Sequence, residues 1–162
     1  MNDDKYVSLD RMRYIKNTRS ANLALLAILF DVFFFISLYE SDVGNWYYNI
    51  LIGASILYNL VFLLAAFLCS EGVKNYKAGY SYAMIVLGII QLLRIFIYPV
   101  RAHAAVVTVQ EQAVPVMGSG QFVRLVLYLV CSAACLFAGA AIGLVRSREL
   151  SAHIAAQDGK AA

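Results

Sequence analysis

The run ANLALLAILFDVFFFISLY, residues 21–39, is a nearly continuous apolar stretch that contains a single charged residue, Asp31. A helix of roughly 20 residues crosses a hydrocarbon core of about 30 Å. Three later stretches have similar length and character: Trp46–Cys69, Tyr80–Val100 and Phe122–Val145. The sequence therefore predicts an all-α, polytopic membrane protein, an antiparallel bundle of four transmembrane helices over 21–39, 46–69, 80–100 and 122–145.

The composition agrees with this prediction. Of the 162 residues, 62% are hydrophobic and 14% are charged, whereas a soluble domain usually has about a quarter charged residues. The four runs do not alternate apolar and polar residues, so helices rather than barrel strands would satisfy their backbone groups in lipid. The first run is too long for the apolar region of a signal peptide and lacks a convincing cleavage site before Glu40. We therefore expect it to remain as the first span.

The distribution of lysine and arginine predicts the orientation, because cytoplasmic loops are enriched in these residues. Ten of them lie in segment 1–20, loop 70–79 and tail 146–162, whereas the other side has only Arg101 and Arg124. We expect a cytoplasmic segment 1–20, a transmembrane domain 21–145 with an outer loop 101–121, and a cytoplasmic tail 146–162. The expected location is a cell membrane, the inner membrane of a bacterium, with both termini cytoplasmic. The net charge of +3 follows from this asymmetry, and no presented basic patch indicates a nucleic-acid partner.

Two segments outside the spans have local patterns. In segment 1–20, Ser8 is a candidate N-cap, and Leu9, Met12 and Ile15 follow at helical spacing among basic residues. This pattern predicts a basic amphipathic helix that lies on the membrane surface and continues into the first span. In the outer loop, Pro99 should end or kink the third helix. Valines over 106–109 and 114–116 favour a small hairpin, Pro115 weakens its second strand, and a continuing helix is the alternative.

The fourth run has small residues along one face: Cys131, Cys135, Gly139 and Gly143 recur every four residues. Small residues allow membrane helices to approach closely, so we interpret these four residues as a helix-packing face rather than a metal or redox site. The sequence leaves open whether the partner is another helix of the chain or a second copy.

Other cysteine and histidine chemistry is not indicated. A quinone-linked thiol oxidoreductase would need cysteine pairs in the outer loops, and the third cysteine, Cys69, is at the inner end of the second span. A membrane haem protein would need histidines in the spans, whereas His103 and His153 lie outside them. We therefore predict no metal and no cofactor.

Asp31 lies near the middle of its span, where an ionisable group costs about 3 kcal/mol and almost always has a partner inside the bundle. Asn59 in the second span and Gln91 in the third lie at comparable depth. Arg94 lies about 6 Å further out, but side chains lean toward the helix N-terminus, so its guanidinium can reach back to Asp31. These four residues, Asp31, Asn59, Gln91 and Arg94, form the predicted polar cluster.

The polar cluster has two interpretations. It either fixes which helices meet or provides a site for a proton, ion or polar solute. A permanently adjacent arginine favours the ionised carboxylate, which makes proton exchange harder and favours the structural role. The chain contains no nucleotide-binding loop, zinc motif or Ser–His arrangement.

We therefore expect a non-enzymatic integral membrane protein that acts through helix association, as a homo-oligomer or an accessory subunit. Its expected partners are the lipid bilayer and itself or other membrane subunits. A small transporter or channel using Asp31 and Arg94 is the alternative. An enzyme acting on lipids near Arg101, Arg124 and Tyr128 is a third, weaker one.

Overall fold

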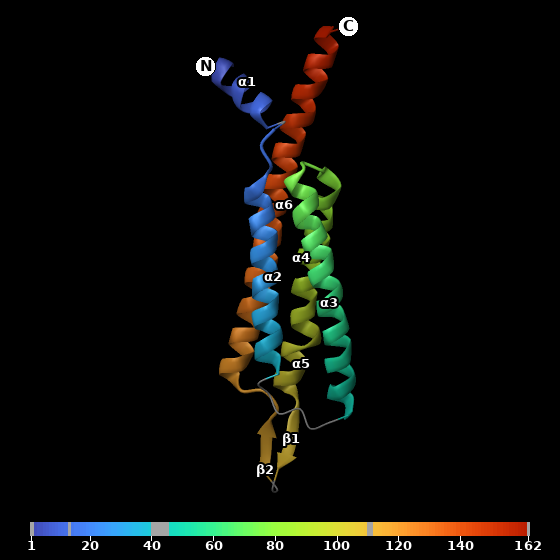
Figure 1. Ribbon diagram of the computed structural model, residues 1–162. Coiled ribbons are helices and arrows are strands. Elements are labelled where there is room, and N and C mark those ends of the chain that lie inside the picture. The colour runs from blue at the N-terminus through green and yellow to red at the C-terminus, as the bar shows by residue number, and fades with distance from the viewer. Residues whose placement is uncertain (1, 13, 40–45, 110–111, 162) are drawn as a thin grey trace.

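The structure, a computed structural model, describes residues 2–12, 14–39, 46–109 and 112–161. Four long helices lie side by side (Figure 1): α2 (Thr18–Leu38), α3 (Trp46–Lys74), α4 (Ala78–Ile97) and α6 (Ser119–Ala161). Each contains a segment that is long and apolar enough to cross a membrane. The described chain thus has the four apolar helices expected of a multi-pass membrane protein.

The remaining elements are short: α1 (Asn2–Arg11), α5 (Pro99–Ala104), β1 (Val106–Val109) and β2 (Gln112–Pro115). α4 ends at Ile97 and α5 begins at Pro99, which confirms that the proline interrupts the third helix. The sequence left open a continuing helix or a hairpin for the following segment, and both occur. The six-residue helix α5 comes first, and an antiparallel hairpin follows it. Pro115 pairs with Val106 at the open end of the hairpin, where a missing N–H disturbs a strand least.

Two expectations about helix ends were wrong. Ser8 lies inside α1 rather than at its N-terminus, and α1 ends at Arg11 without continuing into the first span. Instead, Asn17 is the N-cap of α2, and its side chain accepts a hydrogen bond from the Ser20 backbone N–H. At the other end of the chain, α6 continues far beyond residue 145 as one helix, because no proline or glycine interrupts residues 144–158.

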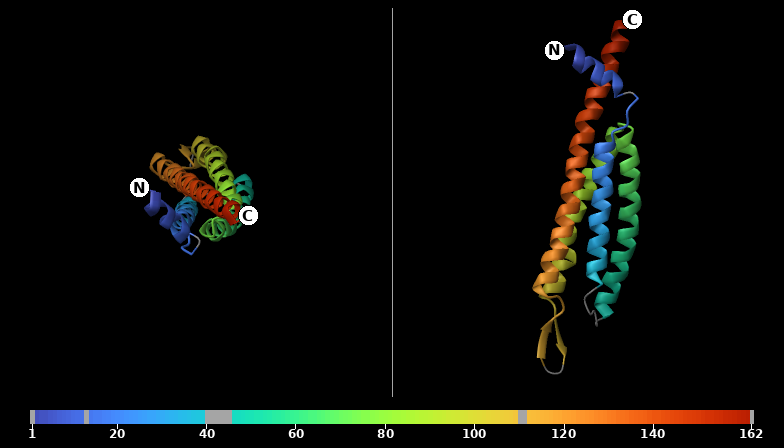
Figure 2. Two further views of the ribbon diagram at one scale, coloured as in Figure 1. Left: turned by 90° about the horizontal axis from the view of Figure 1, so that it is seen from above. Right: turned by 60° about the vertical axis from the view of Figure 1, so that its left-hand side comes forward.

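Helix α6 is the central packing element. It contacts both α2 and α4 along their length, and α3 completes the group by packing against α2 and α4. Viewed from above and from the side, the four helices stay adjacent (Figure 2). The N- and C-termini lie at one end of this assembly, where α1 lies beside the extension of α6, and the hairpin lies at the opposite end (Figures 1 and 2).

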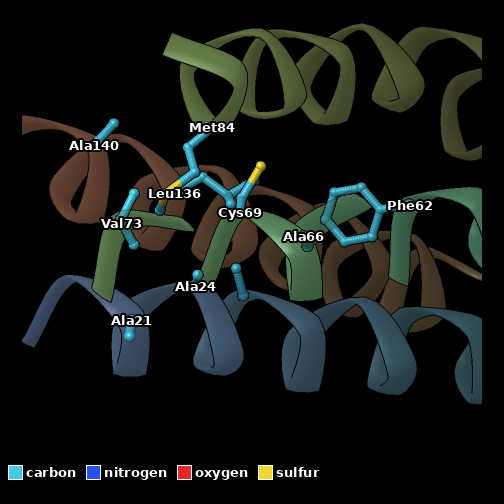
Figure 3. Close-up of a cluster of buried hydrophobic side chains, with 10 residues drawn as sticks. Ala21, Ala24, Phe62, Ala66, Cys69, Val73, Met84, Leu136 and Ala140 are labelled. Atoms are coloured by element: carbon cyan, nitrogen blue, oxygen red, sulfur yellow. The ribbon is translucent and has the colours of Figure 1, made fainter. Parts of the chain in front are cut away.

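Small residues bring these helices together. Ser20, Ala24 and Ala27 share one buried face of α2 with Asp31, as the spacing predicts. Figure 3 shows the hydrophobic core in the half of the bundle nearer the two chain termini. Here alanines of α2 and α6 pack with larger side chains such as Phe62 of α3 and Met84 of α4. A second core at the hairpin end is built around Phe34, Leu125 and Leu129.

The predicted small-residue face of α6 lies partly inside the chain. Gly139 and Gly143 are buried, whereas Cys131 and Cys135 are half-buried. A Cβ atom on Gly139 would lie 2.7 Å from Met84 Cε and 3.2 Å from the Ser20 carbonyl oxygen. The Ser20 hydroxyl also donates a 2.6 Å hydrogen bond to the Gly139 carbonyl. The glycines therefore allow α6 to approach α2 and α4 of the same chain.

Candidate functional site

The centre of the molecule contains an ion pair between α2 and α4. Arg94 Nη1 lies 2.8 Å from Asp31 Oδ1, and the two side chains are 2% and 1% exposed. Asp31 is buried because it continues the small-residue face of α2. Arg94 lies one turn after Gln91 on the buried face of α4. The pair thus joins two helices that each direct one charged side chain inward.

The second nitrogen of the guanidinium connects the ion pair to α3. Arg94 Nη2 donates hydrogen bonds to Asn59 Oδ1 and, over 3.1 Å, to Ser55 Oγ. Ser55 and Asn59 are four residues apart on one face of α3, and both are buried. A planar guanidinium suits this role because its donors point in fixed directions toward separate acceptors. Arg94 therefore links α2, α3 and α4.

Gln91 extends the network to α6. Its Nε2 donates to Asp31 Oδ1 over 2.9 Å and to Ser132 Oγ over 3.2 Å. The Ser132 hydroxyl donates in turn to the Ala27 carbonyl over 2.9 Å. On its other side, Gln91 Oε1 accepts a 3.4 Å hydrogen bond from the Tyr58 hydroxyl. All four long helices thus contribute to one hydrogen-bond network.

Aromatic rings surround the guanidinium. Arg94 Cζ lies 4.3 Å from the centre of the Phe34 ring, 4.5 Å from that of Tyr58 and 5.7 Å from that of Tyr98. Such cation–π contacts strengthen when the cation is removed from water. The rings come from α2, α3 and the C-cap of α4, so they cover the cation from several helices. The charge is therefore held by an anion, by neutral acceptors and by aromatic faces.

A crevice of about 210 Å³ reaches the cluster from the side. It lies between α2 and α3 and is bounded by Asp31 and Asn59 together with apolar residues such as Phe35 and Leu60. The surface accessible inside this crevice is apolar. The polar atoms of Asp31 and Asn59 consequently face the bundle interior rather than the crevice.

Two donors of the cluster are not matched. Asn59 Nδ2 and Arg94 Nε are buried without a hydrogen-bond partner among the residues that the structure describes. Buried polar atoms usually have a partner, so these two nitrogens are donors that the described network leaves without an acceptor.

The described part of the chain has no cluster of side chains suited to a metal ion. Within the described ranges, no three His, Cys, Asp or Glu residues come close enough together to hold a metal ion. The three cysteines, Cys69, Cys131 and Cys135, are free thiols.

The structure brings together all four residues of the predicted polar cluster. It adds Ser55, Ser132 and the rings of Phe34 and Tyr58 to these four residues. Ser55 and Tyr58 are close to Asn59 in sequence, so helical spacing was a usable signal for both. Ser132 was harder to predict, because its only distinguishing feature in the sequence is that it follows Cys131 of the small-residue face. Arg101, Arg124 and Tyr128, the residues of the lipid-enzyme hypothesis, are in α5 and α6, and the hydrogen bonds of the network described above join other residues.

Comparison with protein families, curated proteins and solved structures finds no match to this chain.

Proposed function

We propose that this chain is a non-enzymatic integral membrane protein that acts through lateral association, as a homo-oligomer or as an accessory subunit of a membrane assembly. In this proposal it is an antiparallel four-helix bundle in a cell membrane, the inner membrane of a bacterium, with both termini cytoplasmic. The excess of lysine and arginine at the end that carries both termini supports the orientation.

One observation carries the proposal: the polar cluster is occupied by the protein's own groups. Arg94 is paired with Asp31, bonded to two side chains of α3 and covered by rings, and the adjacent crevice is apolar. Buried polar groups of this kind can fix which helices meet and at what rotation. With the central charges engaged inside the described part of the bundle, the outer helix faces are the surfaces through which we propose that the protein acts.

The exposed side of α6 supports association further. Ala134 and Ala138 lie exposed on this helix, one turn apart on the same side of it. Small residues let another transmembrane helix approach closely. Because Gly139 and Gly143 pack within the chain, these exposed alanines are the small residues that we assign to contact with a second copy or another subunit.

Mild solubilisation from native membranes, followed by mass measurement and identification of co-purifying polypeptides, tests the proposal. We expect a particle larger than the 17.9 kDa chain in its detergent micelle. Ala134→Leu should reduce the larger species, because a bulky side chain would separate the helices. Leu127→Ile, also an exposed site on α6, is the matched control and should leave it unchanged. A monomer without any associated polypeptide would refute the proposal.

A small transporter or channel is the second candidate function, and the unmatched donors Asn59 Nδ2 and Arg94 Nε favour it. Purified protein reconstituted in vesicles would be assayed for proton flux with an entrapped pH-sensitive dye and for chloride flux with a chloride-sensitive dye. If the cluster conducts, equal amounts of folded Asp31→Asn and Arg94→Gln protein should lose the flux. Flux that persists in both variants would remove these residues from that role.

A further inference from the structure

A groove of about 370 Å³ runs along α6 where the first turn of α2 meets it. Its lining combines two arginines and a glutamate with three apolar residues: Arg19, Arg146, Glu149, Ala141, Ile142 and Val145. We propose that this groove binds an anionic phospholipid, whose phosphate lies between Arg19 and Arg146 and whose acyl chain follows the apolar wall. This inference rests on the proposed orientation in the membrane, but not on the proposed lateral association.

The depth of the two arginines suits a headgroup. Arg19 precedes Asp31 by twelve residues on α2, which is about 18 Å along a helix axis. With Asp31 near the midplane, this distance slightly exceeds half of a hydrocarbon core of about 30 Å. Arg146 lies at the same level, because its Nη1 is 3.4 Å from Oδ1 of Asn17, the N-cap of α2. Both guanidinium groups are thus placed where lipid phosphates lie.

The charges of the groove are only partly neutralised within the protein. Arg19 is exposed and makes no hydrogen bond or ion pair in the described part of the chain, and Arg146 donates only to the neutral Asn17. Glu149 also borders the groove, so the three charged side chains leave one net positive charge. Basic pockets between transmembrane helices on the cytoplasmic side commonly bind anionic headgroups. Guanidinium groups suit phosphate because they donate paired hydrogen bonds to its oxygens.

The apolar wall favours a lipid over a free anion. Along α6, Val145, Ile142 and Ala141 precede Arg146 and so extend from the headgroup level toward the membrane interior. An inorganic ion would leave this wall uncovered, whereas an acyl chain would pack against it. The groove therefore matches a molecule that is anionic at one end and apolar at the other.

Native mass spectrometry of the full-length protein in detergent, titrated with phosphatidylglycerol or phosphatidylcholine, tests this proposal. We expect phosphatidylglycerol to bind more tightly than phosphatidylcholine. Arg19→Gln should weaken phosphatidylglycerol binding about fivefold, and the pair Arg19→Gln with Arg146→Gln about 25-fold, as expected for loss of one and two basic contacts near the headgroups. Glu149→Gln should tighten binding, because it removes a repulsive carboxylate.

Three comparisons make the experiment decisive. Arg148→Gln removes the same charge from an exposed site on α6 outside the groove and should change binding less than twofold. A loss equal to that of Arg19→Gln would show a general charge effect and overturn the site. Equal binding of the two lipids would overturn it as well. Displacement of phosphatidylglycerol by an equal concentration of inorganic phosphate would assign the groove to a free anion and overturn the lipid. Since Arg19 makes no hydrogen bond or ion pair with the described residues whose loss would disturb folding, its single variant keeps the test valid even if the double variant unfolds.

Discussion

Asp31→Asn is expected to destabilise the folded protein by about 4 kcal/mol, because it leaves Arg94 charged and without its counter-ion inside the bundle. Arg94→Gln should cost less, about 2 kcal/mol at neutral pH. A buried carboxylate that loses its partner can take up a proton, whereas an arginine cannot lose one. Gln91 also remains to donate to Asp31 Oδ1. The free energy of unfolding, measured from reversible denaturation in mixed micelles of increasing dodecyl sulfate content, gives both values.

Two double variants separate direct pairing from general loss of polarity. Replacing both partners, Asp31→Asn with Arg94→Gln, should cost less than the sum of the two single changes, because neither charge is then left alone. The charge-reversed pair, Asp31→Arg with Arg94→Asp, should fold better than either reversal alone. Equal destabilisation of the two single-reversal variants and the double-reversal variant would contradict a direct ion pair.

The ion pair was predictable from sequence because charged residues are rare in spans and costly without a partner. One acid and one arginine at nearby depths in the spans are therefore predicted to pair, and the rise per residue of a helix gives the depth of each. The hydrogen bond of Ser132 was less predictable. Serine is tolerated on any face of a span, and only the relative rotation of the helices brings this hydroxyl to Gln91. The same holds for the ring of Phe34, since residues 33–35 are all phenylalanine and only one of them is fully buried.

The spans were predictable for a similar reason, but their ends were not. Apolar length identifies α2, α3, α4 and α6, since few other structures tolerate such runs. The polar continuation of α6 has good helix formers and a contact with α1, neither of which hydropathy reveals. In loop 101–121, helix and strand preferences are close in strength, so the position of the change from α5 to β1 depended on packing beside α6. Periodicity also located the small-residue face of α6 without showing which neighbour would cover it.

That face leads to the second large effect, at Gly139. Gly139→Leu is expected to destabilise the protein by about 3 kcal/mol, because the added side chain must enter a closely packed contact. Its Cβ alone would lie 3.2 Å from the Ser20 carbonyl oxygen and 3.3 Å from Leu23 Cβ, and neither backbone nor Cβ can move independently of α2. Met84 Cε is closer, at 2.7 Å, but it is the end of a flexible side chain. Separation of the helices would also stretch the hydrogen bond from the Ser20 hydroxyl to the Gly139 carbonyl.

Ala138→Leu provides the matched control, because it adds a bulky side chain to the preceding residue, which is exposed. It should change the free energy of unfolding of the detergent-solubilised monomer by less than about 0.5 kcal/mol. Gly139→Ala should fall between the two, since Met84 can retreat from a methyl group while α2 must shift by only a few tenths of an ångström. If Gly139→Leu were as stable as Ala138→Leu, α6 would not contact α2 through this glycine. The small-residue face would then be available to a second copy, and the interior packing of α6 would have to be assigned to another face.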